Sequence, residues 1–319
     1  MKAYLGVDVG SVSTNLVLID AQDGTVTHRL YLRTRGRPIT AVQSGLAELG
    51  RLVPDAEVVG AGATGSGRRL AGILIGADVV KNEITAHAVA ALDFCPDAQT
   101  VIEIGGQDSK LILLRKAVIS DFNMNTVCAA GTGSFLDQQA ARLGISIEDF
   151  ASEALKATRQ VRIAGRCAVF AESDMIHKQQ IGHALPDILY GLCQALVRNY
   201  LNNVARGKEL RPPVIFQGGV AANLAMRRAF EESLGHPVLV PPDHGVMGAV
   251  GAAMLAREGM PAGASTRFRG FSVADEAFTT TGFNCHGCPN DCEIVEARSN
   301  QKVLARWGGR CERWQAVAG

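Results

Sequence analysis

Short apolar runs alternate with glycine-rich turns and with helically spaced apolar positions through most of the chain. The segments 3–9 and 16–19 are apolar and flank a Gly/Ser/Thr loop, and 57–63 has the composition of a buried strand. Apolar residues recur with helical spacing over 39–52 and 84–94. This alternation of strands and helices predicts an α/β fold.

The strand, polar loop and strand at the N-terminus recur about 95 residues later. Thr100–Ile104 leads into Gly-Gly-Gln-Asp-Ser, and Leu111–Leu114 resumes the apolar run. In each copy an acidic residue, Asp8 or Glu103, stands two positions before the first glycine. The repetition predicts two halves of similar fold.

The second half continues with alternating elements and then changes in composition. A Pro/Gly/Ala/Ser/Thr stretch at 261–266 is typical of a linker, and four of the eight cysteines follow it. We therefore expect a first half at 1–97, a second half at 98–260, and a linker with a Cys-rich tail at 261–319. The elements expected in the second half are helices at 133–143, 168–180 and 185–205, a strand at 214–217, and helices beginning near Val220 and Val246.

Composition narrows the classes of partner. The chain has 319 residues, which at roughly 150 per domain suggests about two domains. Its 32 basic residues balance 31 acidic ones, so no polybasic nucleic-acid surface is indicated. The N-terminus lacks the apolar region of a signal peptide, and no apolar run reaches the ~18 residues of a membrane span. We expect a cytoplasmic protein that binds neither nucleic acid nor membranes.

In that compartment the eight cysteines favour metal ligation or thiol chemistry over disulfides. Cys128 and Cys167 each stand just before a predicted helix, whose N-terminus favours the thiolate form that binds metal. A 4Fe–4S cluster needs four thiolates, so two copies of this pair would complete one across a homodimer. The alternative is a buried thiol that acts as a small apolar residue. We assign that role to Cys95 and Cys193, and for Cys128 and Cys167 taken alone it is the favoured interpretation.

Three glycine loops suit a nucleotide. Backbone N–H groups and hydroxyls of the two repeated loops can contact phosphate oxygens, and Asp8 can hold Mg²⁺ through water. A third loop places Gly218 and Gly219 between a strand and a helix start. Taken alone, the Gly10-Ser11 loop is equally consistent with a hairpin turn, whereas a plain strand-to-helix turn would not need both Gly218 and Gly219. The candidate nucleotide contacts in these loops are Gly10, Ser11, Ser13, Thr14, Gly105, Gly106, Gly218, Gly219 and Asn223.

The order of these motifs resembles the acetate kinase, sugar kinase, Hsp70 and actin superfamily over residues 1–256. That resemblance implies two similar ribonuclease H-like domains with ATP in the cleft between them. Three runs are more specific, and together they resemble the BadF/BadG/BcrA/BcrD-type ATPases that activate 2-hydroxyacyl-CoA dehydratases and benzoyl-CoA reductases. The runs are Glu-Ile-Gly-Gly-Gln-Asp-Ser-Lys (103–110), Cys-Ala-Ala-Gly-Thr-Gly-Ser-Phe-Leu-Asp (128–137) and Cys-Ala-Val-Phe-Ala-Glu-Ser (167–173).

This resemblance implies an oxygen-sensitive homodimer in which Cys128 and Cys167 of both chains hold one bridging 4Fe–4S cluster. ATP hydrolysis would drive single-electron transfer to a 2-hydroxyacyl-CoA dehydratase or an acyl-CoA reductase, with ferredoxin or flavodoxin as the donor. Gly131, Thr132 and Gly133 would adjoin both nucleotide and cluster.

The catalytic roles follow from the same resemblance. Gln107 would orient the attacking water, while Asp8 and Glu103 position Mg²⁺ or that water. Asn15 stands in the first loop where we expect lysine in many relatives, and its amide can still donate a hydrogen bond.

The tail carries a second candidate metal site, made of Cys285, Cys288, Cys292 and Cys311. Spacings of two, three and eighteen residues suit four thiolates around Zn²⁺ or a second 4Fe–4S cluster, and His286 allows a Cys/His variant. The redox character of the body favours iron and sulfide. A similar Cys-rich segment occurs in longer members of the activator family.

Two other functions stay open. The main alternative to the activator is a small-molecule kinase of the same superfamily, whose cysteines are only structural. The chain would also suit a nucleotide-sensing ATPase with a zinc tail. His177, His183 and His244 are assigned no role, because single histidines are more often fillers than ligands.

Overall fold

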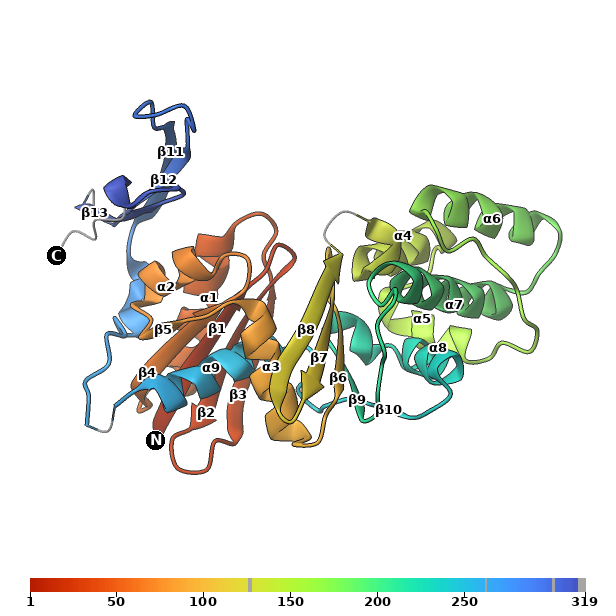
Figure 1. Cartoon of the computed structure of the whole chain (residues 1–319), viewed down its shortest axis with the longest axis horizontal. Coiled ribbons are helices and arrows are strands. Elements are labelled where there is room, and N and C mark those ends of the chain that lie inside the picture. The colour runs from red at the N-terminus through yellow and green to blue at the C-terminus, as the bar shows by residue number, and fades with distance from the viewer. Residues whose placement is uncertain (126–127, 262, 300–301, 315–319) are drawn as a thin grey trace. The chain divides into compact units, whose positions relative to one another are not determined.

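The computed structural model describes residues 1–125, 128–261, 263–299 and 302–314 (Figure 1). The chain forms two compact units: Met1–Asn82 with Ala252–Gly319, and Glu83–Gly251. This division differs from the expected boundaries after residues 97 and 260, because the helix over 83–94 belongs to the second unit and the C-terminal region to the first. Thr126 and Val127, directly before Cys128, and residues 262, 300–301 and 315–319 of the expected tail lie outside the described residues.

The first unit is built on a five-stranded sheet in the order β3-β2-β1-β4-β5. β1 pairs antiparallel with β2 and β2 with β3, whereas β1, β4 and β5 run parallel. Alternate side chains of β1 are buried in the core that α1 and α2 cover. The bounds are β1 Lys2–Val9, β2 Ser13–Asp20, β3 Val26–Arg33, α1 Pro38–Leu52, β4 Glu57–Thr64, α2 Arg68–Ile75 and β5 Val79–Val80.

The second unit repeats this sheet, in the order β10-β9-β6-β7-β8. Again the first three strands in sequence pair antiparallel, and the later two extend the sheet in parallel. The prediction of two halves with the same fold is therefore confirmed. The strands are β6 Thr100–Ile104, β7 Ser109–Arg115, β8 Val118–Asn125, β9 Val214–Gln217 and β10 Val238–Leu239.

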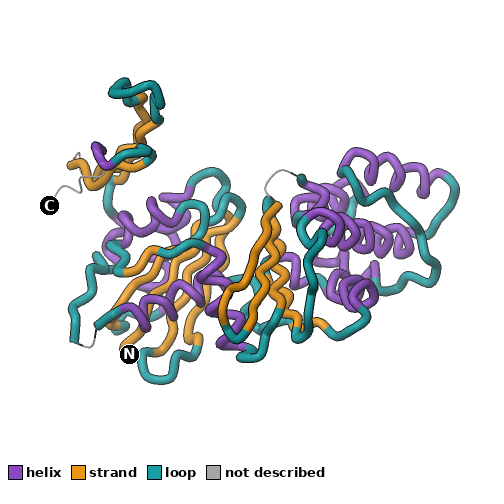
Figure 2. Tube along the Cα trace, viewed as in Figure 1, coloured by secondary structure: helices purple, strands orange, loops and turns teal. Residues whose placement is uncertain are grey.

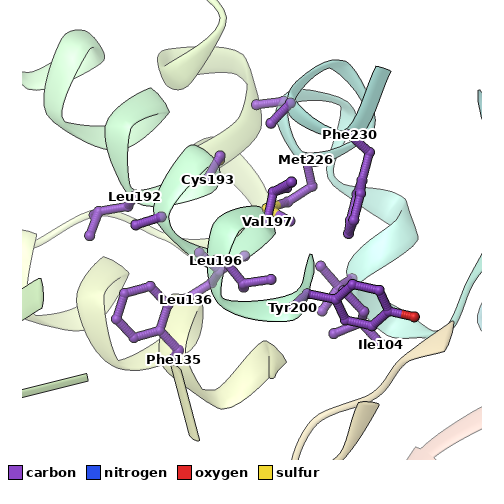
Figure 3. Packing of buried hydrophobic residues seen from close by; sticks show 14 of the residues in the cluster. Ile104, Phe135, Leu136, Leu192, Cys193, Leu196, Val197, Tyr200, Met226 and Phe230 are labelled. Atoms are coloured by element: carbon purple, nitrogen blue, oxygen red, sulfur yellow. The ribbon is translucent and has the colours of Figure 1, made fainter. Parts of the chain in front are cut away.

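Two layers of helices cover the two faces of this second sheet. Ile102 and Ile104 join one core with α4 to α8, in which the ring of Tyr200 meets Phe230 edge-on at 5.6 Å (Figure 3). Val101 packs on the opposite face, which α3 covers. Figure 2 shows how much of this unit is helical. The helices are α3 Glu83–Phe94, α4 Gly133–Leu143, α5 Ile147–Ala154, α6 Ala168–Gln180, α7 Leu185–Asn203 and α8 Leu224–Leu234.

The C-terminal region continues the first unit before it forms a small sheet of its own. α9 (Met247–Gly259) contacts β4, since a Cβ added at Gly62 would lie 2.0 Å from the Ala252 carbonyl oxygen. The 3-10 helix η3 (Phe271–Asp275) packs on α1, and the Gln43 amide donates to the carbonyl oxygens of Val273 and Glu276 at 3.2 and 2.7 Å. The segment after 261–266 is thus packed onto the first unit before the tail sheet begins.

The tail sheet has three antiparallel strands, β11 Phe278–Asn284, β12 Glu293–Ser299 and β13 Lys302–Trp307. Sequence analysis did not assign these strands, nor β3, β8, α2 and α5. Within the described part of the chain, no helix is both long enough and apolar enough to cross a membrane.

Candidate functional site

The first glycine loop connects β1 and β2 and is held by a buried pair of threonines. The Gly10 N–H donates to the Ser13 carbonyl at 2.9 Å. The hydroxyls of Thr14 and Thr34 are 2.9 Å apart, and that of Thr34 also donates to the Gly10 carbonyl at 3.0 Å. Thr14 is fully buried, so its hydroxyl braces the loop, whereas Ser11 is exposed and Ser13 half-buried.

Asp8 lies at the carboxyl end of β1, paired in register with Asn15 on β2. A further glycine turn lies against it, because a Cβ added at Gly65 would be 2.3 Å from Asp8 Oδ1. Gly65 has a φ of +91°, a conformation that favours glycine. The Gly67 N–H fixes this turn by donating to the Val9 carbonyl at 2.8 Å. Sequence analysis assigned the strand before this turn, at 57–63, but gave the turn no role.

The second glycine loop carries a buried charge cluster that sequence analysis missed. Lys110 is 2% exposed, and its Nζ lies 2.8 Å from Glu103 Oε2, 2.8 Å from Asp108 Oδ2 and 3.6 Å from Glu83 Oε2. Glu103 pairs in register with Lys110 as Asp8 pairs with Asn15. The lysine that we expected at position 15 thus has its counterpart in the second repeat. The sequence did carry a signal for this cluster, because Lys110 stands at the start of an apolar strand, where a lysine is rarely buried unless it is paired.

Burial and neighbouring charges shift the pKa values of Glu103 and Lys110. Burial raises the pKa of Glu103 to about 7, with Asp108 and Glu83 acting in the same direction and Lys110 opposing them. Burial alone lowers the pKa of Lys110, but the three carboxylates raise it above its usual value. Lys110 is therefore charged at neutral pH, and Glu103 can gain or lose a proton there. Such a carboxyl group is suited to proton transfer or to cation binding.

The third loop meets the second at this carboxyl group. Gly218 has a φ of +90°, and a Cβ there would lie 2.7 Å from Glu103 Oε1. Its N–H donates to the His244 carbonyl at 2.8 Å. On the strand before it, Gln217 Nε2 lies 2.9 Å from His87 Nδ1, and burial lowers the pKa of His87 to about 3, so that imidazole is neutral. His244, which was assigned no role, helps to shape this loop.

The remaining residues that the sequence assigned to the nucleotide or to catalysis are Gly219, Asn223 and Gln107. Gly219 begins the 3-10 helix η2 (Gly219–Ala222), and the Asn223 side chain accepts a hydrogen bond from the Met226 N–H at 3.0 Å. Asn223 therefore caps α8 and has that structural role in addition to any ligand contact. Gln107 is exposed at the second loop.

The helix that follows Cys128 is tied to the second loop. The Gly133 N–H donates to the Gly105 carbonyl at 2.8 Å, and the Ser134 N–H donates to the Gly106 carbonyl at 2.9 Å. Thr132, just before α4, is fully buried. The first amides of α4 thus bind the loop itself, and movement of one segment must move the other.

A single asparagine connects the segments that carry the two candidate cluster cysteines. Asn199 Nδ2 lies 3.9 Å from Cys128 Sγ and 2.6 Å from the Gly165 carbonyl oxygen, two residues before Cys167. The Asn125 side chain accepts from the Cys128 N–H at 2.9 Å. Sequence analysis missed both asparagines, and a polar residue inside the apolar 185–205 helix was the signal for Asn199.

The surroundings of the cysteines separate two kinds of thiol. Cys128 and Cys167 are partly exposed, and Cys167 stands at the N-cap of α6 as predicted. Between Cys128 and α4 lies the 3-10 helix η1 (Ala129–Gly131). Cys193 is fully buried in the α7 core, and burial raises the pKa of its thiol, whereas Cys95 packs on the α3 side. The assignment as a buried packing residue is confirmed for Cys193, whereas Cys95 is partly buried, like Cys128 and Cys167, and packs against the core under α3.

The four tail cysteines lie at one end of the small sheet. The Cys285 N–H donates to the Cys292 carbonyl at 2.8 Å, and Cys288 belongs to the turn between them. Trp307 pairs with Val295, which brings Cys311 toward the same end. Among the residues that the structure describes, no three His, Cys, Asp or Glu side chains form a group ready to hold a metal ion, here or elsewhere.

Two repeated sheets with an acidic residue and a glycine loop at the end of each first strand define an ATPase fold of the actin and Hsp70 type. The chain belongs to the BadF/BadG/BcrA/BcrD ATPase family, which matches residues 5–256. Residues 257–319 lie outside that match.

Individual relatives agree with this assignment. The (R)-2-hydroxyglutaryl-CoA dehydratase activating ATPase of Acidaminococcus fermentans is 34% identical over 260 residues, covering 80% of this chain and 98% of that protein. The crystal structure of the Acidaminococcus fermentans (R)-2-hydroxyglutaryl-CoA dehydratase component A has a TM-score of 0.75 at 32% identity and covers 81% of this chain and 99% of its own. The structure of the activator of 2-hydroxyisocaproyl-CoA dehydratase from Clostridium difficile, with bound ADPNP, has a TM-score of 0.72 at 27% identity. The match covers 81% of this chain and 95% of that activator's chain.

Proposed function

We propose that this chain is an ATP-driven electron-transfer activator. Two protomers would share one 4Fe–4S cluster, held by Cys128 and Cys167 of each, and would pass single electrons to a 2-hydroxyacyl-CoA dehydratase or a related acyl-CoA reductase. A ferredoxin or flavodoxin would supply the electrons. Support comes from family membership and from relatives that are named as activators of such dehydratases.

The observation that carries the proposal is a continuous set of contacts between the second glycine loop and both cysteines. Gly133 binds the Gly105 carbonyl, the same turn leads back to Cys128, and Asn199 contacts Cys128 and the residues before Cys167. A change at the phosphate loop therefore has a direct mechanical route to both proposed ligands. Neither a kinase nor a nucleotide sensor needs such a connection to two thiols.

The cysteines themselves suit a shared cluster. Cys128 and Cys167 are partly accessible and form no disulfide, and two ligands per chain leave the site incomplete without a second copy. Val169 and Phe170, beside Cys167, are 68% and 65% exposed, as residues at a subunit or partner contact commonly are. When bound, the cluster would supply a centre that gains or loses one electron.

For ATP hydrolysis we assign the protein groups as follows. The glycine loops hold the phosphates, Asp8 and Glu103 position Mg²⁺ or the attacking water, and Gln107 orients that water. Lys110 keeps Glu103 in place and compensates the negative charge of the buried carboxylates. Its charge is already shared among three carboxylates, so we assign it a positioning role.

We further propose that the tail binds its own metal, Zn²⁺ or a second 4Fe–4S cluster, through Cys285, Cys288, Cys292 and Cys311. Support comes from the strand pairing, which brings the segments next to the four cysteines to one end of the sheet. Four thiolates are a complete ligand set for either centre within one chain.

Electron paramagnetic resonance of protein purified and reduced without oxygen tests the function. We expect a 4Fe–4S signal that changes between MgADP and MgATP. This nucleotide-sensitive signal should be lost in Cys128→Ser and Cys167→Ser and retained in the matched control Cys95→Ser, whereas a signal from a cluster in the tail would be lost only in Cys285→Ser. A chain without iron that phosphorylates a metabolite would instead be a kinase. Zinc without iron, with redox-independent ATP hydrolysis, would indicate the nucleotide sensor.

A further inference from the structure

A basic hollow of about 1400 Å³ lies within the second unit, beside the segment that leads into Cys167. Its walls come from residues 162–166, from α6, from the end of α7 and from the turn after it. The charged residues that line it are Arg162, Arg166, Lys178, Arg198, Arg206 and Asp174.

Positive charge is in excess in the hollow, because five cationic side chains line it with a single carboxylate. Its single carboxylate, Asp174, accepts a hydrogen bond from the Ala164 N–H at 2.8 Å. In the ranges that the structure describes, none of the five cationic side chains forms an ion pair. Burial lowers the pKa of Arg198, and the charge of Arg162 lowers it further. The chain as a whole carries a net charge of only +1, so this concentration of positive charge is local.

The hollow and the proposed cluster ligands share the same short segment. Arg198 Nη2 donates to the Ile163 carbonyl at 2.6 Å, and the adjacent Asn199 donates to the Gly165 carbonyl and contacts Cys128 Sγ. A molecule seated in the hollow would therefore touch the backbone that positions both cysteines.

We propose that this basic hollow docks a carboxylate-rich surface of the protein that donates electrons to the cluster. The inference rests on the proposed function and adds to it the place and the chemistry of the donor's contact. Like charges held together without counter-ions are costly for the fold, and they become favourable when an acidic partner binds. A hollow of this volume admits a protruding acidic loop, and a small charge-based contact suits a carrier that must leave after each transfer.

The transfer step is balanced without a further reactant. One electron leaves the reduced carrier, which is oxidised, and the cluster held by Cys128 and Cys167 is reduced by one electron. No bond is broken, and no proton is required.

Charge reversal at exposed positions of the hollow tests the proposal. The variant Arg162→Glu/Arg206→Glu is compared with the neutral pair Arg162→Gln/Arg206→Gln. A control with the same change in net charge, Arg51→Glu/Lys116→Glu, alters exposed residues that do not line the hollow. The probe is an acidic 2[4Fe–4S] ferredoxin, whose binding is measured without oxygen at about 20 mM and about 500 mM salt, since the higher salt screens charge beyond ~5 Å.

We expect at least tenfold weaker ferredoxin binding for the reversed pair at low salt, an intermediate loss for the neutral pair, and a change below twofold for the control. High salt should remove the differences. Equal affinities, or a wild-type chain that does not bind at low salt, would overturn the proposal. A change of oligomeric state in the reversed pair alone would also overturn it, because the hollow would then be a contact between copies.

Iron measured on the same samples separates this proposal from the function on which it rests. Ferredoxin binding that depends on the hollow in a chain without iron would keep the docking surface and reject the electron-transfer function. If every variant retains iron and binds ferredoxin with unchanged affinity, the docking surface is rejected and the electron-transfer function is kept. In stopped-flow measurements, reduction by ferredoxin should slow at least tenfold in the reversed pair, while reduction by dithionite should not change.

Discussion

Gly131→Ala should disconnect the two cysteine segments without altering either cysteine. A Cβ at Gly131 would lie 2.8 Å from Asn199 Oδ1 and 3.1 Å from Asn125 Nδ2, inside the roughly 3.5 Å at which such atoms are in contact. Asn199 must therefore move, and its 2.6 Å hydrogen bond to the Gly165 carbonyl is the interaction at risk.

The expected cost follows from those contacts. Overpacking a buried site and disturbing one buried amide hydrogen bond each cost about 1–3 kcal/mol, and the two overlap here, so we expect a loss of about 2 kcal/mol in the free energy of unfolding. For a unit of this size that corresponds to a fall in Tm of roughly 4–8 °C. The matched control is Gly282→Ala, whose added Cβ makes only an ordinary contact at 3.5 Å. Its change should stay within about 0.5 kcal/mol.

A double-mutant cycle shows whether Asn199 is the residue displaced. In an Asn199→Ala background the 2.8 Å clash with Asn199 Oδ1 is gone and only the 3.1 Å contact with Asn125 Nδ2 remains, so Gly131→Ala should cost less than about 1 kcal/mol in denaturant unfolding. An equal cost of Gly131→Ala in both backgrounds would refute the reasoning, because the strain would then lie elsewhere in the turn.

Four further predictions concern Glu103 and the C-terminal region. Because burial raises the pKa of Glu103 to about 7, the ATPase rate should rise with pH through that value. In a pH–rate profile, Glu103→Gln should abolish this rise and lower the ATPase rate by about 10²-fold. The same shift means that the folded chain holds this proton more tightly than the unfolded chain, so the contribution of Glu103 to unfolding free energy should fall between pH 4.5 and 7, as denaturation at several pH values would show. A chain ending at Ala264 should lose several kcal/mol of stability because it lacks the helix η3 that packs on α1, whereas one ending at Phe278 should unfold like the full chain; equal Tm values would contradict this. Cys285→Ser should remove the tail metal, and the exposed His286→Asn should keep it, as metal analysis of each variant will show.

The repeated pattern made much of the fold predictable from sequence. The segment of strand, loop and strand occurs twice, each time with an acidic residue before the loop, and this repetition predicted two halves of similar fold. The structure confirms it, because the strands of both sheets pair in the same order. Strands β3 and β8 were missed because they alternate between exposed and partly buried positions at the side of each sheet, without an apolar run. The unit boundaries differ because α3 and the C-terminal region pack on elements distant in sequence, which local composition does not report.

The site was predictable as a set of motifs but not as a set of contacts. Residue types and spacing indicated the glycine loops and the two cysteines, and the structure gives each a place. The roles of Lys110 and Asn199 depend on which side chains tertiary packing brings near them, Glu103 for the first and Cys128 for the second. For Thr14 the sequence predicted a role that its contacts do not support. Its hydroxyl has the chemistry for phosphate binding, but it forms a hydrogen bond with another buried threonine.

The iron content of the dimer tests the central claim most directly. Iron and acid-labile sulfide are measured without oxygen on a chain ending at Phe278, which lacks the tail cysteines, together with its mass in solution. A shared 4Fe–4S cluster predicts about two irons per protomer in a dimer, and Cys128→Ser should lose both the iron and the sulfide. A chain that binds ATP as a monomer, or that holds no iron with both cysteines intact, would contradict the account.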